Sequence, residues 1–227
     1  MAERISKSAR TRQRILDAAA KVFRQQGYAG ARLSDIADLA GMQTGSLYYH
    51  FASREELVAE ILHLGIEKAW AHVTDAVDSL PECASATERL ATAIRAHTMA
   101  VLQLSDYTTA QARIVGQVPP EIAKVHRSEQ RKYGEFWHTF FVAVRDDGLI
   151  APDADLVTMR LLAFGAMNWT SEWFNPKRGP SAAAVAEQTI ALVMHGVLAP
   201  LAAVAPKAAA KQRATAPRAT APRRAKA

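Results

Sequence analysis

The sequence predicts an all-α protein, and three observations support this. The chain of 227 residues is rich in Ala, with Leu and Val common and only 11 Gly, a composition that favours helix. Apolar residues recur at spacings of three and four along most of the chain, which is the period of an amphipathic helix. No segment keeps the alternation of apolar and polar residues that marks a half-buried strand. We therefore expect about nine helices and no sheet.

The N-terminal 52 residues predict three of these helices. The first carries an apolar stripe made of Ile15, Ala18, Ala19, Val22 and Phe23. Gly27 follows this stripe and supplies a stop at the C-terminal end of the helix. A second, short helix spans residues 33–39 and ends at Gly41, and a third spans residues 44–50.

The second and third helices fit a helix-turn-helix. Ala37 is small where the two helices cross, and Gly41, four residues on, stands where a tight turn needs a left-handed backbone. Leu47, ten residues after Ala37, packs the third helix back onto the second. The remaining members of this small core are Ile36 and Leu39.

The third helix, in the stretch "QTGSLYYHF", is too short to bury all its aromatic residues. Leu47 and Phe51 are four residues apart and share the inward face, whereas Thr44 and Tyr48 share the outward face. A helix N-terminus attracts phosphate and reaches base edges in the major groove, and a Tyr hydroxyl hydrogen-bonds phosphate. We therefore expect Tyr48 to contact DNA. The neighbouring Tyr49 and His50 either contact DNA or support the fold.

The rest of the chain predicts longer helices. Ser53 and Glu56 form the pattern of a capping box, which starts a helix with apolar residues through Val77. "LPECAS" interrupts it, and helix resumes near Thr87 until Pro119 and Pro120. Later helices end at Gly148, run from residue 156 to about 174 after "PDAD", and run from a Ser181 cap to about residue 198.

Charge is distributed unevenly along the chain. Residues 1–54 hold nine Lys/Arg against four Asp/Glu, a net charge of +5, and residues 55–205 have a net charge of −6. Residues 206–227 hold seven basic residues and no acidic ones. This polarity indicates that one end meets a polyanion. We predict a helix-turn-helix domain at residues 1–52, a ligand-binding and dimerisation domain at residues 53–201, and a disordered basic tail at residues 202–227.

Several classes of protein are disfavoured. A lone cysteine, Cys83, gives no internal disulfide and fits a reducing cytosol. The most apolar stretch, residues 190–204, is too short and is interrupted by His195 and Pro200, so we expect a cytoplasmic protein with no membrane span. There is no GxSxG, HExxH or phosphate-binding glycine loop, and the seven histidines lack metal spacing. We expect no enzyme activity, cofactor or metal.

The motifs of the N-terminal region carry a family resemblance. The segment "RTRQRILDAAAKVFRQQGYAGARLSDIADLAGMQTGSLYYHFASREELVAEIL" resembles the DNA-binding domain of TetR-family transcriptional regulators. The resemblance implies DNA contacts from the starts of the first, second and fourth helices and from the third helix. Carried over by position, these contacts are Arg12, Arg32, Gln43, Thr44, Gly45, Tyr48, Tyr49, His50 and Arg54.

Two positions depart from the family pattern. Arg32 stands where the family commonly has a Ser or Thr that caps the second helix, so a phosphate contact replaces the cap or the cap is lost. Thr44 stands where the family often has Lys or Arg. Affinity for DNA then depends more on the basic residues of the two termini.

The C-terminal helices fit a homodimer. The helix over residues 156–174 is apolar on every side, as expected for a helix buried on two sides, and its small residues Ala163, Gly165 and Ala166 allow close approach of another helix. Burial within one chain is the alternative. We favour a dimer whose two helix-turn-helix units bind a palindromic double-stranded operator.

The resemblance also implies a small-molecule effector in the C-terminal domain. Its candidate contacts are Trp70, His97, Tyr107, Phe136, Trp137, Phe140, Phe164, Asn168, Trp169 and Trp173. Most of these aromatic residues are equally explained as core, and His97 as a hydrogen-bonded core histidine. Asn168 needs a hydrogen-bond partner on its apolar helix, and a bound ligand is one option.

The stretch "GAMNWTSEWF" resembles TetR regulators of fatty-acid and steroid breakdown, many of which respond to acyl-CoA thioesters. The basic residues that would meet CoA phosphates are Arg113, Arg127, Arg131 and Lys132, unless they are simply solvated. Together the patterns indicate a repressor that a small apolar effector such as an acyl-CoA releases from its operator, with the long helix after Ser53 as the lever. The alternatives are an architectural DNA-binding protein without effector and, less favoured, an all-helical enzyme.

Deletion of residues 206–227 tests whether the basic tail touches DNA. We expect weaker DNA binding, mainly at low salt, because each neutralised phosphate contributes about 0.9 to the slope of log affinity against log salt concentration. The measurement is operator affinity over a salt series for the full and shortened chains. An unchanged slope would show that the seven basic residues of the tail do not touch DNA.

Overall fold

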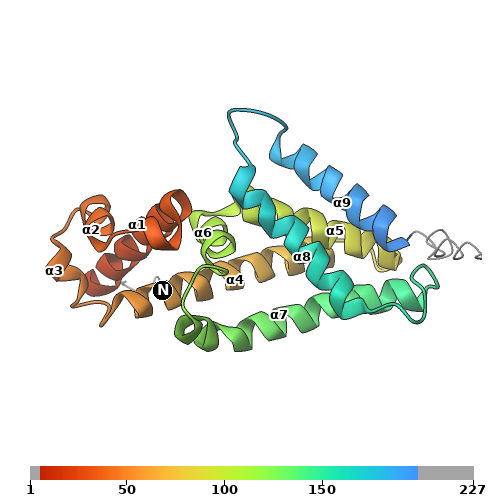
Figure 1. Cartoon of the computed structure of the whole chain (residues 1–227), viewed down its shortest axis with the longest axis horizontal. Coiled ribbons are helices and arrows are strands. Elements are labelled where there is room, and N and C mark those ends of the chain that lie inside the picture. Colours follow the sequence, from red (N-terminus) through yellow and green to blue (C-terminus); the bar gives the residue numbers. More distant parts are fainter. Residues whose placement is uncertain (1–5, 199–227) are drawn as a thin grey trace, which may run out of the picture.

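The computed structural model describes residues 6–198 of the chain, and all regular structure in that part is helical (Figure 1). The order of elements is α1 (Lys7–Gly30), α2 (Leu33–Ala40), α3 (Thr44–Leu47), α4 (Arg54–Asp78), α5 (Ala86–Met99), η1 (Ala100–Leu104), α6 (Asp106–Ile114), α7 (Pro120–Asp146), α8 (Leu156–Trp173) and α9 (Ala182–Leu198). Over this range there is no β-strand, only an isolated bridge between Asn175 and Arg178. The all-α prediction is confirmed, and the predicted tail lies outside the described residues.

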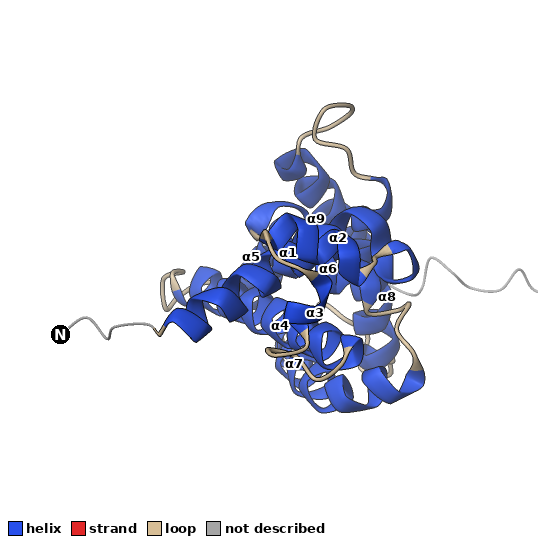
Figure 2. Cartoon of the chain, turned by 90° about the vertical axis from the view of Figure 1, so that its left-hand side faces the viewer, coloured by secondary structure: helices blue, strands red, loops and turns tan. Residues whose placement is uncertain are grey.

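The molecule is elongated, with α1, α2 and α3 at one end and the other helices extending away from them (Figure 1). Figure 2 looks onto that end and shows α1, α2 and α3 in front of the helices α4 to α9. None of the helices between residues 6 and 198 combines the length and the apolar character that a bilayer crossing needs.

The predicted stops and caps of the N-terminal region are largely confirmed. Gly27 has φ of 70° and breaks the helical backbone, although a further helical turn follows it. Gly41 ends α2 in the left-handed conformation, with φ of 67°, which glycine adopts without steric cost. The third helix is shorter than predicted: it ends at Leu47, and residues 48–50 form a turn in which the His50 amide donates to the Leu47 carbonyl at 2.9 Å.

The start of α4 differs from the predicted capping box by one residue. Ser53 Oγ accepts from the Glu56 amide at 3.1 Å, as a capping serine does. The Glu56 carboxylate, however, accepts from the amide of Ala52 at 2.6 Å, not from that of Ser53. Two hydrogen bonds therefore fix the start of α4. The second one binds Glu56 to Ala52, the residue that connects the helix-turn-helix to Ser53.

One break in the C-terminal region was not predicted. The helix that resumes at Ala86 continues through the π-helical turn η1 and then stops at Ser105, whose hydroxyl accepts from the Thr108 amide and starts α6. The apolar spacing of three and four continues across this break, and no Gly or Pro marks it, so the pattern did not reveal it. The other predicted ends hold: α7 begins at Pro120, Gly148 follows its end with φ of 75°, and Ser181 Oγ accepts from the Ala184 amide.

Two main apolar cores result, and the first crosses the predicted domain boundary. The N-terminal core contains Ile15, Phe23 and Leu47, but also Leu57 and Ile61 from α4. It further takes Tyr107, Ala110 and Ile114 from α6. The division at residue 52 remains a prediction about function, because packing continues across it.

The second core joins the C-terminal half of α4 to α5, α7, α8 and α9. Its largest fully buried side chains are Trp137 and Phe141.

The prediction that Leu39 belongs to the core of the helix-turn-helix is wrong. Leu39 is 53% exposed, whereas Ile36 is 1% exposed. Residues 37 and 40 fill the inward face of α2, which turns the side chain at 39 outward.

Candidate functional site

The helix-turn-helix presents a polar and aromatic surface at the tip of the molecule. Leu47 and Phe51 are both 3% exposed and face inward, as predicted. Tyr48 is 56% exposed and Tyr49 is 90% exposed. A side chain that is 90% exposed supports no core, so this favours the DNA contact for Tyr49 over a role in the fold. Gln43, Thr44 and Gly45 are exposed beside them, and His50 is half-buried.

Two of the predicted DNA-contacting arginines are engaged within the protein. Arg54 Nη2 donates to the Tyr28 carbonyl at 2.5 Å, and its guanidinium lies 4.2 Å over the Tyr28 ring. Arg12 pairs with Glu60 at 3.0 Å and lies 4.7 Å over the Phe51 ring. Both therefore hold α1 and the helix-turn-helix against the start of α4, which positions the exposed tyrosines.

Arg32 behaves as its departure from the family pattern indicates. It is exposed, occupies the N-cap position of α2, and makes no side-chain cap hydrogen bond. The cap is therefore lost. The guanidinium is left at the surface beside the helix start, where a phosphate contact is sterically open.

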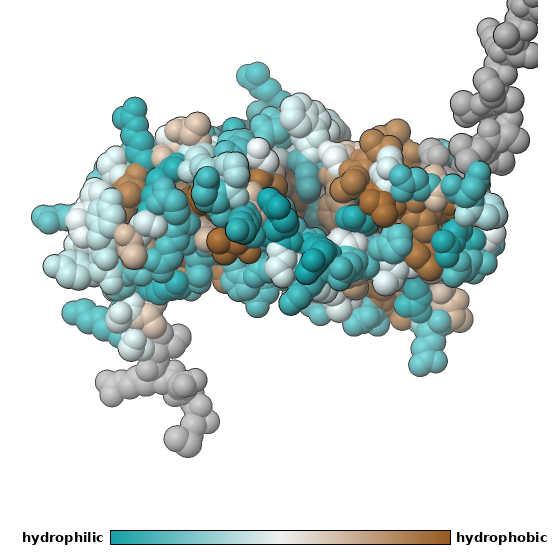
Figure 3. All heavy atoms as spheres, turned by 60° about the horizontal axis from the view of Figure 1, so that its bottom comes forward, coloured by the Kyte–Doolittle hydropathy of each residue, from teal (hydrophilic) through white to brown (hydrophobic). Residues whose placement is uncertain are grey.

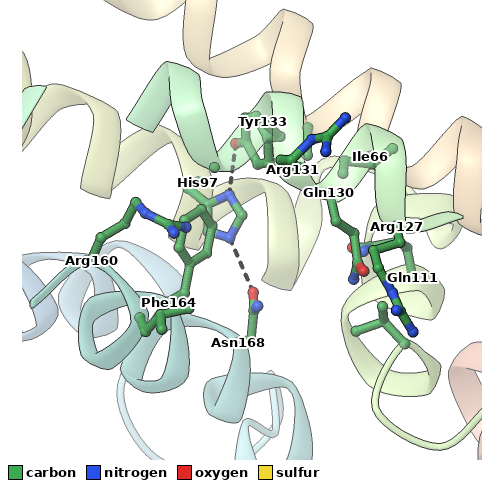
Figure 4. Close-up of a pocket in the computed structure, with 14 residues that line it drawn as sticks. Ile66, His97, Gln111, Arg127, Gln130, Arg131, Tyr133, Arg160, Phe164 and Asn168 are labelled. Atoms are coloured by element: carbon green, nitrogen blue, oxygen red, sulfur yellow. Dashed lines mark hydrogen bonds between the residues drawn. The ribbon is translucent and has the colours of Figure 1, made fainter. Parts of the chain in front are cut away.

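A cavity of about 380 Å³ lies in the C-terminal domain, enclosed by α4, α5, α6, α7 and α8 (Figure 4). Apolar side chains form one part of its wall: Ile66, Ala69, Val115, Leu161 and Phe164. Polar side chains form the rest: His97, Gln111, Arg127, Gln130, Arg131, Tyr133, Arg160 and Asn168. Such a mixture of apolar wall and a few polar groups is typical of a small-molecule site.

Three polar residues from different helices form a hydrogen-bonded chain at the cavity wall. His97 Nδ1 lies 3.0 Å from the Tyr133 hydroxyl, and His97 Nε2 lies 3.0 Å from Asn168 Oδ1. Figure 4 shows this chain joining α5, α7 and α8. Burial lowers the pKa of His97 to about 4, against a smaller opposing effect of the Asn168 hydrogen bond. The imidazole is therefore neutral at pH 7.

Three arginines bring positive charge to the cavity, and one of them, Arg131, also lies 3.9 Å from Glu135. Arg127 and Arg131 come from α7 and Arg160 from α8, and none of the described residues that line the cavity is acidic. Arg160 passes over Gly134, where a Cβ atom would stand 2.7 Å from its Nη1. Its Nε is buried without a hydrogen-bond partner in the described part of the chain. A bound anion would satisfy such a group.

Some of the predicted ligand contacts line the cavity and others lie behind its wall. His97, Phe164 and Asn168 line the cavity. Trp137 and Phe140 lie behind that wall: the Trp137 ring is 5.6 Å from His97 and 5.8 Å from Phe140. The Trp70 ring, also outside the lining, is 5.4 Å from that of Tyr133 and 5.5 Å from that of Phe136.

Three predicted ligand contacts lie elsewhere. Trp169 and Trp173 are 67% and 52% exposed on α8 and do not line the cavity. Tyr107 is buried between α6 and α1, where its hydroxyl donates to Asp17 at 2.7 Å and accepts from Gln13 at 3.0 Å. The aromatic character of these three residues did not distinguish them from the aromatic residues that line the cavity. Tyr133 and Arg160, which the sequence analysis missed as ligand contacts, show no sequence signal beyond helical spacing.

Helix α6 joins the cavity to the DNA-binding end. Gln111 and Val115 line the cavity from one side of α6. From its other side Arg113 Nη1 donates to the Arg24 carbonyl at 2.6 Å, so this predicted CoA contact is already bonded near the end of α1. Arg24 in turn pairs with Asp106 at 3.1 Å.

The crossing of α6 with α4 is equally tight. A Cβ atom at Gly65 would stand 2.7 Å from the Tyr107 carbonyl oxygen and 2.3 Å from Gln111 Cβ. Only glycine fits at this crossing, so α6 and α4 cannot shift independently without a gap or a clash.

A third surface is apolar. The exposed hydrophobic residues of α8 and α9 are Val157, Leu161, Leu162, Trp169, Trp173 and Leu192. Gly165, on the same helix, is exposed with no atom within 4 Å of an added Cβ. Figure 3 shows hydrophobic side chains gathered over the C-terminal half, whereas the end with α1–α3 is mostly hydrophilic. Exposed apolar side chains gathered on one surface are typical of a protein interface.

Comparison with known proteins agrees with this geometry. The model of bacterial regulatory proteins of the tetR family matches residues 15–61, and that of the tetracyclin repressor-like C-terminal domain matches residues 83–197. The HTH-type transcriptional repressor KstR2 of Mycobacterium tuberculosis (strain ATCC 25618 / H37Rv) is 31% identical over 191 residues, which cover 82% of this chain and 92% of that protein. KstR2 of Rhodococcus jostii (strain RHA1) is 29% identical over 195 residues, with 83% and 92% covered.

Two solved structures share the fold. The ketosteroid transcriptional regulator KstR2 of Mycobacterium tuberculosis superimposes with a TM-score of 0.68 at 27% identity, covering 83% of this chain and 95% of that one. AibR, solved in complex with isovaleryl coenzyme A and operator DNA, superimposes with a TM-score of 0.71 at 22% identity, covering 84% and 99%.

Tyr48→Ala tests the exposed aromatic surface. We expect loss of operator binding, because the ring is exposed directly after α3 and supports no core, while helicity and dimer mass stay unchanged. A mobility-shift titration and circular dichroism measure the two effects. Leu39→Ala, which also truncates an exposed side chain of the same motif, serves as the control and should retain affinity. Unaltered DNA affinity of the Tyr48 variant would contradict the assignment.

Proposed function

Because the chain belongs to the TetR family of bacterial regulatory proteins, we propose that it is a repressor that an acyl-CoA thioester releases from operator DNA. Family membership makes the chain a ligand-responsive, DNA-binding regulator of transcription that acts as a dimer on double-stranded operator DNA. Family membership does not determine the effector, or whether the protein represses or activates transcription. The KstR2 relatives are named repressors, which supports repression here.

The charge of the cavity is the observation that carries the acyl-CoA proposal. Arg127, Arg131 and Arg160 meet at one cavity that has no acidic residue among its described lining. A guanidinium favours bidentate contact with phosphate or carboxylate. The ligand is therefore an anion, and the apolar wall of Ile66 and Phe164 requires that it also carry an apolar group.

The size of the cavity indicates which part of an acyl-CoA it holds, the acyl group or the CoA phosphates. About 380 Å³ lies at the small end of the range for small-molecule sites, about 300–1,000 Å³. This volume suits the acyl group alone. The CoA phosphates then lie towards the exposed Arg127 and Arg131 on α7. AibR, which has the same fold, was solved with isovaleryl coenzyme A and operator DNA.

The DNA contacts are proposed from the exposed surface at the tip. Tyr48, Tyr49, Thr44 and Gln43 meet the major groove directly, with Arg32 at the adjacent backbone. Arg12 and Arg54 act by holding this surface, since both guanidinium groups are bonded within the protein. The exposed face of α8 and α9 pairs with a second copy, which sets two recognition helices at the spacing of successive major grooves, about 34–36 Å.

Helix α6 transmits the effect of the ligand in this proposal. Gln111 and Val115 touch the cavity, and the opposite side of α6 is bonded to α1 through Tyr107 and Arg113. A ligand that displaces α6 therefore moves α1 with it. The long helix α4, expected as the lever from sequence, moves together with α6 because Gly65 leaves no space between them.

An architectural DNA-binding protein without effector is the second candidate. It does not account for a cavity lined by three arginines and a buried polar chain. The two functions differ in whether any small molecule weakens DNA binding.

A release titration tests the effector. We expect long or bulky acyl-CoA thioesters to release the protein from operator DNA, and free CoA and the matching free acids not to, because only the thioester supplies both the apolar group and the phosphates. Fluorescence anisotropy of labelled operator measures release. Arg127→Gln with Arg131→Gln should weaken the thioester effect about tenfold, whereas Lys124→Gln, on the same helix but outside the cavity lining, should not.

The titration also sets the condition for rejecting the acyl-CoA proposal. If no thioester acts below about 100 μM, where binding is worth only about 5.5 kcal/mol, the effector belongs to another chemical class. If the double arginine variant and the lysine control released operator DNA at the same thioester concentration, the arginines of the cavity would not be recognising the ligand.

Tyr107→Phe tests transmission through α6. The variant removes the hydroxyl that joins Asp17 and Gln13 but keeps the buried ring. We expect effector affinity in the absence of DNA to stay the same, and the ratio of effector Kd with and without operator to fall towards one, because that ratio measures the coupling free energy. Calorimetry with and without operator gives both values.

Tyr28→Phe is the matched control for this coupling. It removes the hydroxyl of a half-buried tyrosine in the same region while keeping the ring under Arg54. It should preserve the ratio. A ratio in Tyr107→Phe equal to that of the unchanged protein would show that the α6 hydroxyl contact does not carry the coupling.

A further inference from the structure

The polar chain of Tyr133, His97 and Asn168 has a direction, and this direction determines what the cavity offers to a ligand. His97 is 4% exposed and neutral at pH 7, so one ring nitrogen donates and the other accepts. Two arrangements are possible. Either Tyr133 donates to Nδ1 and Nε2 donates to Asn168, or every bond runs the other way with the Asn168 amide turned over.

The burial of Tyr133 decides between these arrangements. Tyr133 is 4% exposed, and its hydroxyl has His97 Nδ1 as its hydrogen-bond partner. In the reversed arrangement the hydroxyl would accept from Nδ1, and none of the described residues would accept from its own O–H. An unsatisfied buried donor is costly. In the arrangement of the structure, the Tyr133 O–H donates to Nδ1, and Nε2–H donates to Asn168 Oδ1.

The free end of the chain is then the Asn168 amide nitrogen. Its Oδ1 is occupied by His97, whereas none of the hydrogen bonds among the described residues uses Nδ2. Asn168 is only half-buried and lines the cavity, and Figure 4 shows its amide oxygen directed at His97. Two N–H donors are thus held towards the ligand.

We propose that Asn168 Nδ2 donates to the thioester carbonyl oxygen of the effector, and that His97 and Tyr133 are positioning residues that force this donor to face the cavity. The inference rests on the proposed acyl-CoA function and adds a selection rule to it. A ligand that has an sp² oxygen at this point is accepted. A ligand of the same shape without that oxygen leaves Asn168 unpaired and binds more weakly.

A pair of matched ligands tests this rule. Octanoyl-CoA and S-octyl-CoA differ in that a methylene group replaces the carbonyl. We expect calorimetry to give the thioester about tenfold higher affinity for the full chain, equivalent to about 1.4 kcal/mol. Asn168→Leu should remove the difference by weakening only the thioester. Tyr133→Phe should reduce the difference while leaving the thioether affinity unchanged, an effect that a general loss of packing would not produce.

Ile66→Val is the control for cavity shape. It shortens an apolar side chain of the wall and should change both affinities together, so that their ratio stays the same. Equal affinity of the unchanged protein for thioester and thioether would overturn the selection rule while leaving the acyl-CoA proposal intact.

The tautomer of His97 gives a second test that needs no ligand. The ¹⁵N chemical shifts of the ring show which nitrogen carries the proton, and we expect Nε2–H. An Nδ1–H tautomer would overturn the inference whether or not a ligand binds. If neither CoA compound binds, the acyl-CoA proposal fails, and the tautomer then decides by itself whether Asn168 presents its donors to the cavity.

Discussion

The attachment of α6 to α1 is the constraint on which the rest of the structure depends. Of all helix pairs between residues 6 and 198, these two pack most extensively, and the buried Tyr107 hydroxyl, the Arg24–Asp106 pair and the Arg113 bonds to carbonyls of α1 hold them together. The N-terminal core is completed by side chains from α6. The DNA-binding end is therefore not an independent unit joined by a flexible connection, since part of its core belongs to a helix that also lines the cavity.

The cavity is distinguished by the polarity of its hydrogen-bonding groups. Three arginines and the Asn168 amide nitrogen are donors, and the described lining contains two glutamines but no carboxylate. Such a cavity is not satisfied by its own side chains, as the unpartnered Nε of Arg160 shows. Because buried donors without acceptors are costly, the geometry favours a ligand rich in acceptor oxygens, and the neutral His97 holds the Asn168 amide in one orientation.

The exposed aromatic and apolar groups have a common explanation. Tyr49, at 90% exposure, and Trp169, at 67%, are large side chains that a single folded chain leaves in water. They lie on two separate surfaces, the tip of the helix-turn-helix and the face of α8 and α9. In a dimeric DNA-binding protein, operator DNA covers the first surface and the second copy covers the other.

The sequence by itself determined the helical class, most helix ends and the helix-turn-helix, because local signals specify them: Gly41 supplies the left-handed turn, and Ser181 and Pro120 mark helix starts. It also predicted His97 and Asn168 as ligand contacts, and both line the cavity. Tertiary structure alone decided which aromatic residues reach the cavity, since Trp169 and Tyr107 have the same character as Phe164 but face solvent or α1. It likewise decided that Arg12 and Arg54 are bonded internally and that Arg160 enters the cavity over Gly134. Helical periodicity gives the side of a helix on which a residue stands, but only packing against other helices decides what that side meets.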